Sequence, residues 1–211
     1  MTKHPFSPNG YTYVVLDTCV LLPSRLSDVL FDLMHEKLYF LQWTQDVEQE
    51  FLRNWPSVHV TRPLAGPRRL AAFQRAARYG HLIAGHHKTS YTSRVPARVH
   101  YNDKHLIAAA LVMLDSCHAE QRRYHHKVFV VSDNTKHLAV KETAQLGVNV
   151  YTAGHFLNQL FNLAPTRCLR AIERSRADLK NPPYTKQQFA ATLRIHKADA
   201  LADGIKLNKA E

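Results

Sequence analysis

The stretch Tyr13-Val14-Val15-Leu16-Asp17-Thr18 runs from strand-forming apolar residues directly into a carboxylate. A continuous apolar run of this kind is typical of a strand that is buried on both faces, as strands are in a parallel sheet. The run from Val128 to Val131 repeats the pattern and leads through Ser132 to Asp133. Because open parallel sheets bind ligands at the carboxyl ends of their strands, two such strands side by side would bring Asp17 and Asp133 together.

These two aspartates allow two interpretations. Each could cap the helix that follows its strand, which is a common role of aspartate and the better explanation of one strand alone. Carboxylates that crowd together repel each other, however, and usually need a cation between them. For the pair, in a chain as basic as this one, we favour a metal site.

The overall composition indicates a globular protein with an anionic partner. The chain has 211 residues, of which 45% are hydrophobic, and this length suits one α/β domain with a small addition. The net charge is +11 and the isoelectric point is about 9.7. Nucleic acid is the commonest partner of such a basic protein, and improved solubility is the alternative explanation of the charge.

The positive charge is concentrated in one acid-free span. Residues 51 to 102 contain no Asp or Glu but nine Lys or Arg, with Tyr79, Tyr91 and Tyr101 interleaved. Basic and aromatic side chains together suit phosphate contacts and base stacking, whereas the alternative is a solvated helix face. We therefore predict nucleic-acid contacts in this span and expect Arg69 to be solvated. The predicted nucleic-acid-binding residues are Arg75, Arg78, Arg68 and Lys88.

Cysteine and histidine usage offers no metal-binding motif. Cys19, Cys117 and Cys168 are far apart, which fits neither a disulfide framework nor a zinc site and suggests a reducing compartment. The adjacent pairs His86-His87 and His125-His126 lie in predicted loops without convincing ligand spacing. No apolar stretch approaches a membrane span and no signal peptide is evident, so we expect a soluble cytoplasmic protein without a membrane partner.

The hydrophobic periodicity predicts alternating strands and helices followed by a helical region. We assign residues 1–163 to an α/β domain and residues 164–211 to a helical C-terminal extension. The predicted strands are 13–16, 39–43, 128–131 and 148–151. The predicted helices are 19–37 with an interruption near Pro23, 44–54 ended by Pro56, 70–79, 103–114, 136–146, 155–161, 166–180 and one that starts at 186, with a loop over 81–100.

Two further acids are candidates for the same site. Glu50 borders the apolar stripe of its helix, next to Phe51, so its side chain is directed toward the protein. The alternative is an ordinary surface pair with Arg53. Asp103 opens a strongly apolar helix, where an acid alone would simply stabilise the helix N-terminus.

Taken in order, the four acids resemble the PIN domain of Mg-dependent ribonucleases. The local strings resemble a VapC-type toxin subfamily with a helical C-terminal extension, and the resemblance covers about residues 13 to 195. The strings that carry it are Asp17-Thr18-Cys19-Val20-Leu21-Leu22-Pro23, Trp43-Thr44 with Glu50-Phe51 and Arg53-Asn54, Asn102-Asp103-Lys104-His105-Leu106-Ile107-Ala108, Val131-Ser132-Asp133-Asn134, His155-Phe156-Leu157, and Arg176 to Thr185.

The resemblance implies a PIN-like parallel sheet sandwiched by helices, and a Mg-dependent endoribonuclease that is the toxin of a toxin–antitoxin pair. It implies Mg²⁺ or Mn²⁺ held by Asp17, Glu50, Asp103 and Asp133, with Asn134 as the alternative fourth ligand. The implied partners are RNA and a cognate antitoxin protein, and a homodimer is left open. The chain departs from the family at Cys19, where Asn is common, and at His137, where Asp often stands.

Two other functions remain open on the same residues. One is a structure-specific DNA nuclease with the same fold. The other is a non-catalytic RNA-binding protein of the PIN type, against which the presence of all four acids counts. A nuclease assay on RNA and DNA, with and without Mg²⁺, separates the three.

Overall fold

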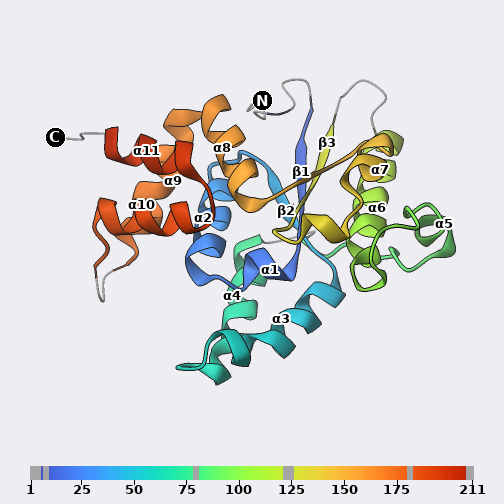
Figure 1. The fold of residues 1–211 in the computed structure, drawn as a ribbon, viewed down its shortest axis with the longest axis horizontal. Helices are drawn as coiled ribbons and strands as arrows, with labels where there is room; N and C mark the ends of the chain where they lie inside the picture. The colour runs from blue at the N-terminus through green and yellow to red at the C-terminus, as the bar shows by residue number, and fades with distance from the viewer. Residues whose placement is uncertain (1–5, 7–9, 78–80, 121–125, 180–182, 208–211) are drawn as a thin grey trace.

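The protein is built around a four-stranded parallel sheet, as the computed structural model shows for residues 6, 10–77, 81–120, 126–179 and 183–207 (Figure 1). The strand order is β2-β1-β3-β4, and every pairing is parallel. The strands are β1 (Thr12–Leu16), β2 (Phe40–Gln42), β3 (Lys127–Val131) and β4 (Val148–Tyr151). The predicted α/β class is confirmed, and the arrangement is consistent with a PIN-like fold.

Helices cover both faces of this sheet. In Figure 1, α6 and α7 lie on one side, and α2, α8 and the C-terminal helices lie on the other. The helical elements are α1 (Thr18–Leu21), α2 (Ser24–His35), α3 (Gln45–Val58), η1 (Pro63–Ala65), α4 (Gly66–Ala77), α5 (Thr89–Thr92), η2 (Tyr101–Asp103), α6 (Lys104–Glu120), η3 (Thr135–His137), α7 (Val140–Gln145), α8 (Ala153–Leu163), α9 (Pro165–Ala177), α10 (Lys186–Ile195) and α11 (Asp199–Leu207).

The core follows directly from the apolar runs. Val14, Val15 and Leu16 of β1 are fully buried, as are residues 106–111 of α6. A strand without polar alternation cannot face water on either side, so β1 occupies an interior position between β2 and β3. The register pairs Leu16 with Val131, and the residues that follow both strands therefore emerge at the same edge.

The structure differs from the sequence prediction at Pro56. The helix was expected to end before this residue, but α3 continues to Val58 with Pro56 inside its last turn. Proline has no N–H, so the hydrogen bond from Pro56 to the carbonyl of Leu52 is missing. Pro56 and Leu52 are both exposed to solvent. Trp55 is buried and stacks on His59 with ring centroids 3.7 Å apart, so packing holds the last turn in place.

Two other segments contain more regular structure than the sequence indicated. The apolar helix α6 extends to Glu120 rather than ending near residue 114. The segment 81–100, expected to be a loop, contains the short helix α5 and an isolated parallel bridge between Trp43 and Leu82. That bridge pairs the segment with the residue that follows β2.

The C-terminal helices pack against the rest of the protein. Helix α9 contacts α2 and α8, and α11 contacts α8 and α10. Buried residues of this region, such as Phe189 and Leu193, belong to the same hydrophobic cluster as the sheet. The division between residues 163 and 164 stays a prediction. None of the helices in the described part of the chain combines the length and apolar character needed to cross a bilayer.

Candidate metal centre

Asp17 lies at the carboxyl edge of the sheet, where the sequence placed it. Its backbone N–H donates to the carbonyl of Val131 at 3.1 Å, which continues the β1–β3 pairing by one residue. Its Oδ2 accepts from the Ser132 hydroxyl at 2.5 Å and from the Cys19 thiol at 3.1 Å. Asp17 is only 7% exposed, so the chain fixes this carboxylate in a buried position.

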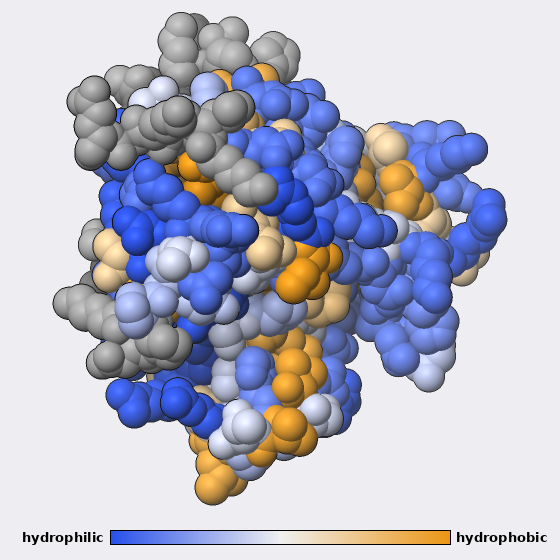
Figure 2. Space-filling view, turned by 60° about the vertical axis from the view of Figure 1, so that its left-hand side comes forward, coloured by the Kyte–Doolittle hydropathy of each residue, from blue (hydrophilic) through white to orange (hydrophobic). Residues whose placement is uncertain are grey.

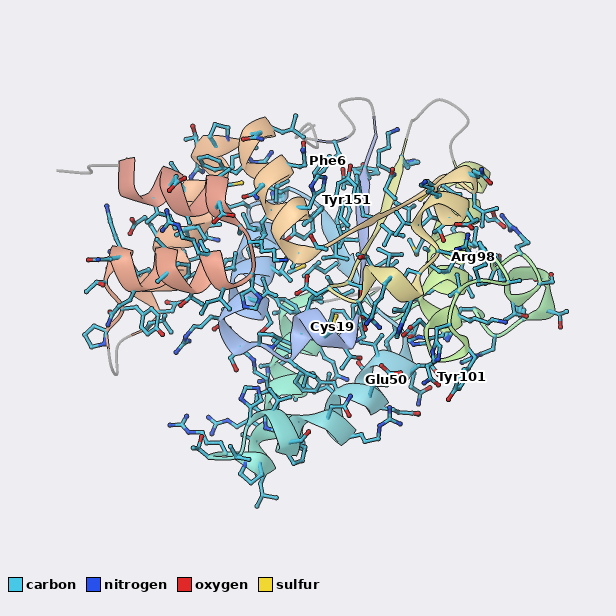
Figure 3. All side chains as sticks on the ribbon, in the orientation of Figure 1. Phe6, Cys19, Glu50, Arg98, Tyr101 and Tyr151 are labelled. Atoms are coloured by element: carbon cyan, nitrogen blue, oxygen red, sulfur yellow. The ribbon has the colours of Figure 1, made fainter. Side chains whose placement is uncertain are left out.

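Glu50 reaches the same region from α3. Thr18, the neighbour of Asp17, donates a hydrogen bond from its hydroxyl to Glu50 Oε2 at 3.0 Å, and His105 Nε2 lies 3.6 Å from Oε1. In Figure 3, Cys19 on α1 and Glu50 on α3 both lie below the sheet, beyond the end of β1. His105 first, and then Thr18, lower the pKa of Glu50 against the effect of burial. The expected alternative, a surface pair with Arg53, is not among the ion pairs of the described residues.

Asp103 precedes α6 and faces two histidines. Its Oδ2 lies 3.4 Å from His137 Nδ1 and 4.0 Å from His100 Nδ1. This oxygen is buried and accepts no hydrogen bond from the described residues. Burial first, and then the negative charge of Asp17, raise the pKa of Asp103, while the histidines oppose the rise. The structure therefore brings the charges of Asp17 and Asp103 close enough to interact.

Asp133 and Asn134 take different positions after β3. Asp133 is exposed, and its Oδ1 accepts from the backbone N–H of Ala153 at 2.9 Å, at the start of α8. The Asn134 side-chain nitrogen lies 2.9 Å from His137 Nδ1, next to Asp103. Ser132, rather than Asp133, contacts Asp17 at the sheet edge. Asp133 therefore bonds the first residue of α8, a helix that follows β4 and has Thr152 as its N-cap, and it does not cap the helix that follows its own strand.

Sequence reasoning missed the histidines of this centre. His100, Asp103 and His137 each offer a ligand atom, and these atoms all lie within 4.8 Å of one another. His100 and His137 also stack, with ring centroids 5.0 Å apart, and the backbone N–H of His100 donates to the carbonyl of His137. The one available signal was His137, which stands where the toxins that the sequence resembles often carry an acid.

The predicted RNA-binding residues lie outside this centre. Arg68 and Arg75 are exposed on α4 and Lys88 is exposed before α5, and none of the three forms an ion pair with the described residues. Arg78 lies outside the described residues. The expectation for Arg69 was wrong, because its guanidinium binds Asp28, the Ser24 carbonyl and the Ser27 hydroxyl and lies over the Phe73 ring.

Comparison with known proteins finds one family. The model of the family described as VapC50 C-terminal domain matches residues 154–206, about a quarter of the chain. The match lies on α8 to α11 and suggests a VapC-type family, and with it a nuclease that is the toxin of a toxin–antitoxin system. No match was found among curated proteins or among solved structures.

Proposed function

We propose that this protein is a metal-dependent endoribonuclease and the toxin of a toxin–antitoxin pair. The observation that carries the proposal is the environment of Asp103. One of its carboxylate oxygens is buried without a hydrogen bond from the described residues, and the charge of Asp17 acts on it. A buried acceptor without a partner is costly, and two neighbouring carboxylates repel, so a divalent cation would relieve both penalties.

The residues of the site fit such a cation. Asp17 and Asp103 would hold it, and carboxylate oxygens are the ligands that Mg²⁺ and Mn²⁺ prefer. Imidazole nitrogens favour softer divalent metals than Mg²⁺, so His100 and His137 beside Asp103 make Mn²⁺ the better candidate of the two. When bound, the cation would lower the pKa of a water and offset the charge that develops on a phosphodiester.

The remaining residues would bind and orient the reactants. Glu50 has a lowered pKa and is therefore ionised at neutral pH, so it can accept a hydrogen bond from the attacking water. The hydroxyl of Thr18 holds the Glu50 carboxylate in that orientation. Exposed basic residues would bind the RNA backbone on either side of the scissile phosphate, where Arg68, Arg75 and Lys88 are the candidates.

The test is a nuclease assay of the full chain on RNA, single-stranded DNA and duplex DNA, with Mg²⁺, Mn²⁺ or chelator. We expect cleavage of RNA only, dependent on the metal, and loss of activity in Asp17→Asn and Asp103→Asn. The matched control is Asp115→Asn, which removes a half-buried acid of α6 that pairs with Arg94. Full activity of either site variant would overturn the assignment. Cleavage of duplex DNA would support the DNA nuclease, and binding of RNA without cleavage would support the non-catalytic protein.

The fourth position of the site is tested separately, because Asp133 and Asn134 face different neighbours. If Asp133 acts in catalysis, Asp133→Ala should reduce activity far more than Asn134→Ala. Loss of the hydrogen bond from the Ala153 N–H to Asp133 should also reduce stability, by about 0.5–1.5 kcal/mol. Activity should therefore be compared at a temperature where both variants are folded. The opposite ranking would transfer the role to Asn134.

An antitoxin partner is supported by exposed apolar side chains. Val58, Val60 and Leu64 follow one another around the turn between α3 and α4 and are 50%, 77% and 91% exposed. Figure 2 shows apolar surface at the lower end of the molecule, where Figure 1 places these elements. Clustered exposed apolar residues are typical of protein interaction sites. A small DNA-binding protein encoded beside this chain should co-purify with it, and Leu64→Asp should weaken that association.

A further inference from the structure

A second cluster of metal-binding side chains lies at the start of α3. Asp46 occupies the first turn of this helix, and the adjacent residues His86 and His87 reach it from the segment that precedes α5. His86 Nε2 lies 2.6 Å from Asp46 Oδ2, and His87 Nε2 lies 3.2 Å from the same oxygen. The ligand atoms of all three residues lie within 4.8 Å of one another.

These separations are close to those of a tetrahedral metal site. Zinc–nitrogen and zinc–oxygen bonds of about 2.0–2.1 Å at tetrahedral angles place neighbouring ligand atoms roughly 3.3 Å apart. The distance from His87 to Asp46 already meets this value, and the distance from His86 would have to lengthen by less than about one ångström. Three protein ligands leave one position of a four-coordinate ion for water.

The backbone explains why two sequence neighbours can converge on one oxygen. Gly85 has a φ of +80°, which favours glycine, and the Lys88 N–H donates to the Gly85 carbonyl at 3.1 Å, so His86 and His87 occupy the corner of a tight turn. The Ile83 N–H donates to the Trp43 carbonyl, and the Trp43 N–H to the His81 carbonyl, at 2.8 and 2.9 Å. These bonds hold the turn against the start of α3.

The electrostatics of the cluster favour a cation. Asp46 carries the only carboxylate of the cluster, and both histidines direct a ring nitrogen at its Oδ2. No Arg or Lys of the described residues forms an ion pair with Asp46. His86 is 4% exposed and directs its Nε2 at Asp46, so this ligand atom is held away from bulk water.

We propose that Asp46, His86 and His87 form a binding site for a divalent transition-metal ion of the zinc class, separate from the Asp17–Asp103 centre. Two imidazoles and one carboxylate suit Zn²⁺ better than Mg²⁺. The ion joins the turn at 85–88 to α3, the helix that also carries Glu50 one turn further on. It therefore holds the acid-free span in a fixed position relative to the proposed nuclease centre, and its presence does not depend on catalysis.

The experiment is a titration of the metal-free full chain with Zn²⁺, followed by calorimetry and by the metal content after desalting. Four forms are compared: the wild type, His86→Ala/His87→Ala, Asp17→Asn/Asp103→Asn, and the control His35→Ala/His155→Ala. The control removes two exposed histidines from other helices. The Asp17→Asn/Asp103→Asn form separates this proposal from the proposed nuclease, because it lacks the carboxylate centre and keeps the cluster.

We expect the His86→Ala/His87→Ala variant to bind one equivalent of Zn²⁺ fewer than the wild type and the control. The Asp17→Asn/Asp103→Asn variant should keep this equivalent, and Zn²⁺ should still raise its melting temperature. Asp46→Asn, which keeps the size of the side chain, should weaken the same binding event at least tenfold. The proposal is overturned if the His86→Ala/His87→Ala variant binds as many equivalents as the wild type, or if the Asp17→Asn/Asp103→Asn variant binds none.

Discussion

The substitution Gly154→Ala tests how the C-terminal helices α10 and α11 dock on α8. Gly154 lies in the first turn of α8, and a Cβ at this position would stand 2.1 Å from the carbonyl oxygen of His196 and 2.7 Å from the carbonyl carbon and oxygen of Lys197. Both neighbours are backbone atoms between α10 and α11, so no side chain can rotate away. The two segments must move apart, and α11 loses part of its packing on α8.

The sign of the effect is what makes this prediction informative. On helix propensity alone, Gly→Ala stabilises a helix by about 1 kcal/mol. Overpacking of a close contact costs about 1–3 kcal/mol, and more where backbone must shift, so we expect net destabilisation. Subtracting the propensity gain of about 1 kcal/mol from the upper part of this range leaves a net loss of about 1–2 kcal/mol. For a chain of this length, 1 kcal/mol corresponds to roughly 2–4 °C, which gives a fall in melting temperature of roughly 2–8 °C.

The assay is thermal unfolding followed by circular dichroism, combined with hydrogen exchange. Amides of α10 and α11 should exchange faster in the variant, and those of the sheet should change little. Asn158→Ala should act in the same direction, because its side chain bonds the Lys197 carbonyl at 2.9 Å and the Ala200 N–H at 3.0 Å. His155→Ala, on the exposed side of α8, is the control. A melting temperature equal to or above that of the wild type would refute the close contact between α8 and residues 196–197.

Three further outcomes are expected. The pKa of Asp103 is raised in the folded state, so the ionised carboxylate destabilises the metal-free protein above this pKa, and the destabilisation disappears as the pH falls through the pKa. Asp103→Asn should therefore have a higher melting temperature than the wild type at pH 7 without metal. In melting curves recorded toward pH 4, the difference between the two melting temperatures should shrink. Replacing Arg68, Arg75 and Lys88 by Ala should make the plot of log binding constant against log salt concentration less steep for RNA, by about 0.7 for each phosphate that is no longer neutralised. An unchanged slope would mean that these residues improve solubility and do not bind RNA. Arg69→Ala should instead lower the melting temperature and leave the salt slope unchanged, because Arg69 bonds within the protein.

The sheet and the position of Asp17 could be predicted from the sequence. An apolar run that ends in an acid allows few placements, and the parallel register then fixes which edge the acid occupies. Glu50 was also found, because its neighbours Val47 and Phe51 mark the inward side of α3. The pattern of an acid after a strand does not predict whether Ser132 or Asp133 contacts Asp17, because the side chain of Asp133 is held by the start of α8.

The histidine contacts could not be predicted, because they arise between segments distant in sequence. Asp46 is one acid in the first turn of a helix, which is an ordinary helix-stabilising position. The residues next to it in the sequence give no indication that His86 contacts it. Likewise, His137 reaches Asp103 only through the path of η3 after β3. Arg69 was misjudged for the same reason, since its partner Asp28 lies on another helix.

The pairing of β1 with β3 has a consequence for the newly synthesised chain. The contact between Asp17 and Ser132 joins positions 115 residues apart, and β1 has no β3 to pair with until the whole intervening segment has left the ribosome. Pairings between such distant residues form late in folding, because the entropy of closing a long loop must be overcome first. Asp17 and Asp103 therefore reach their final geometry only after β3 has been synthesised. The nuclease proposed above would in this way remain inactive during the translation of the segment from β1 to β3.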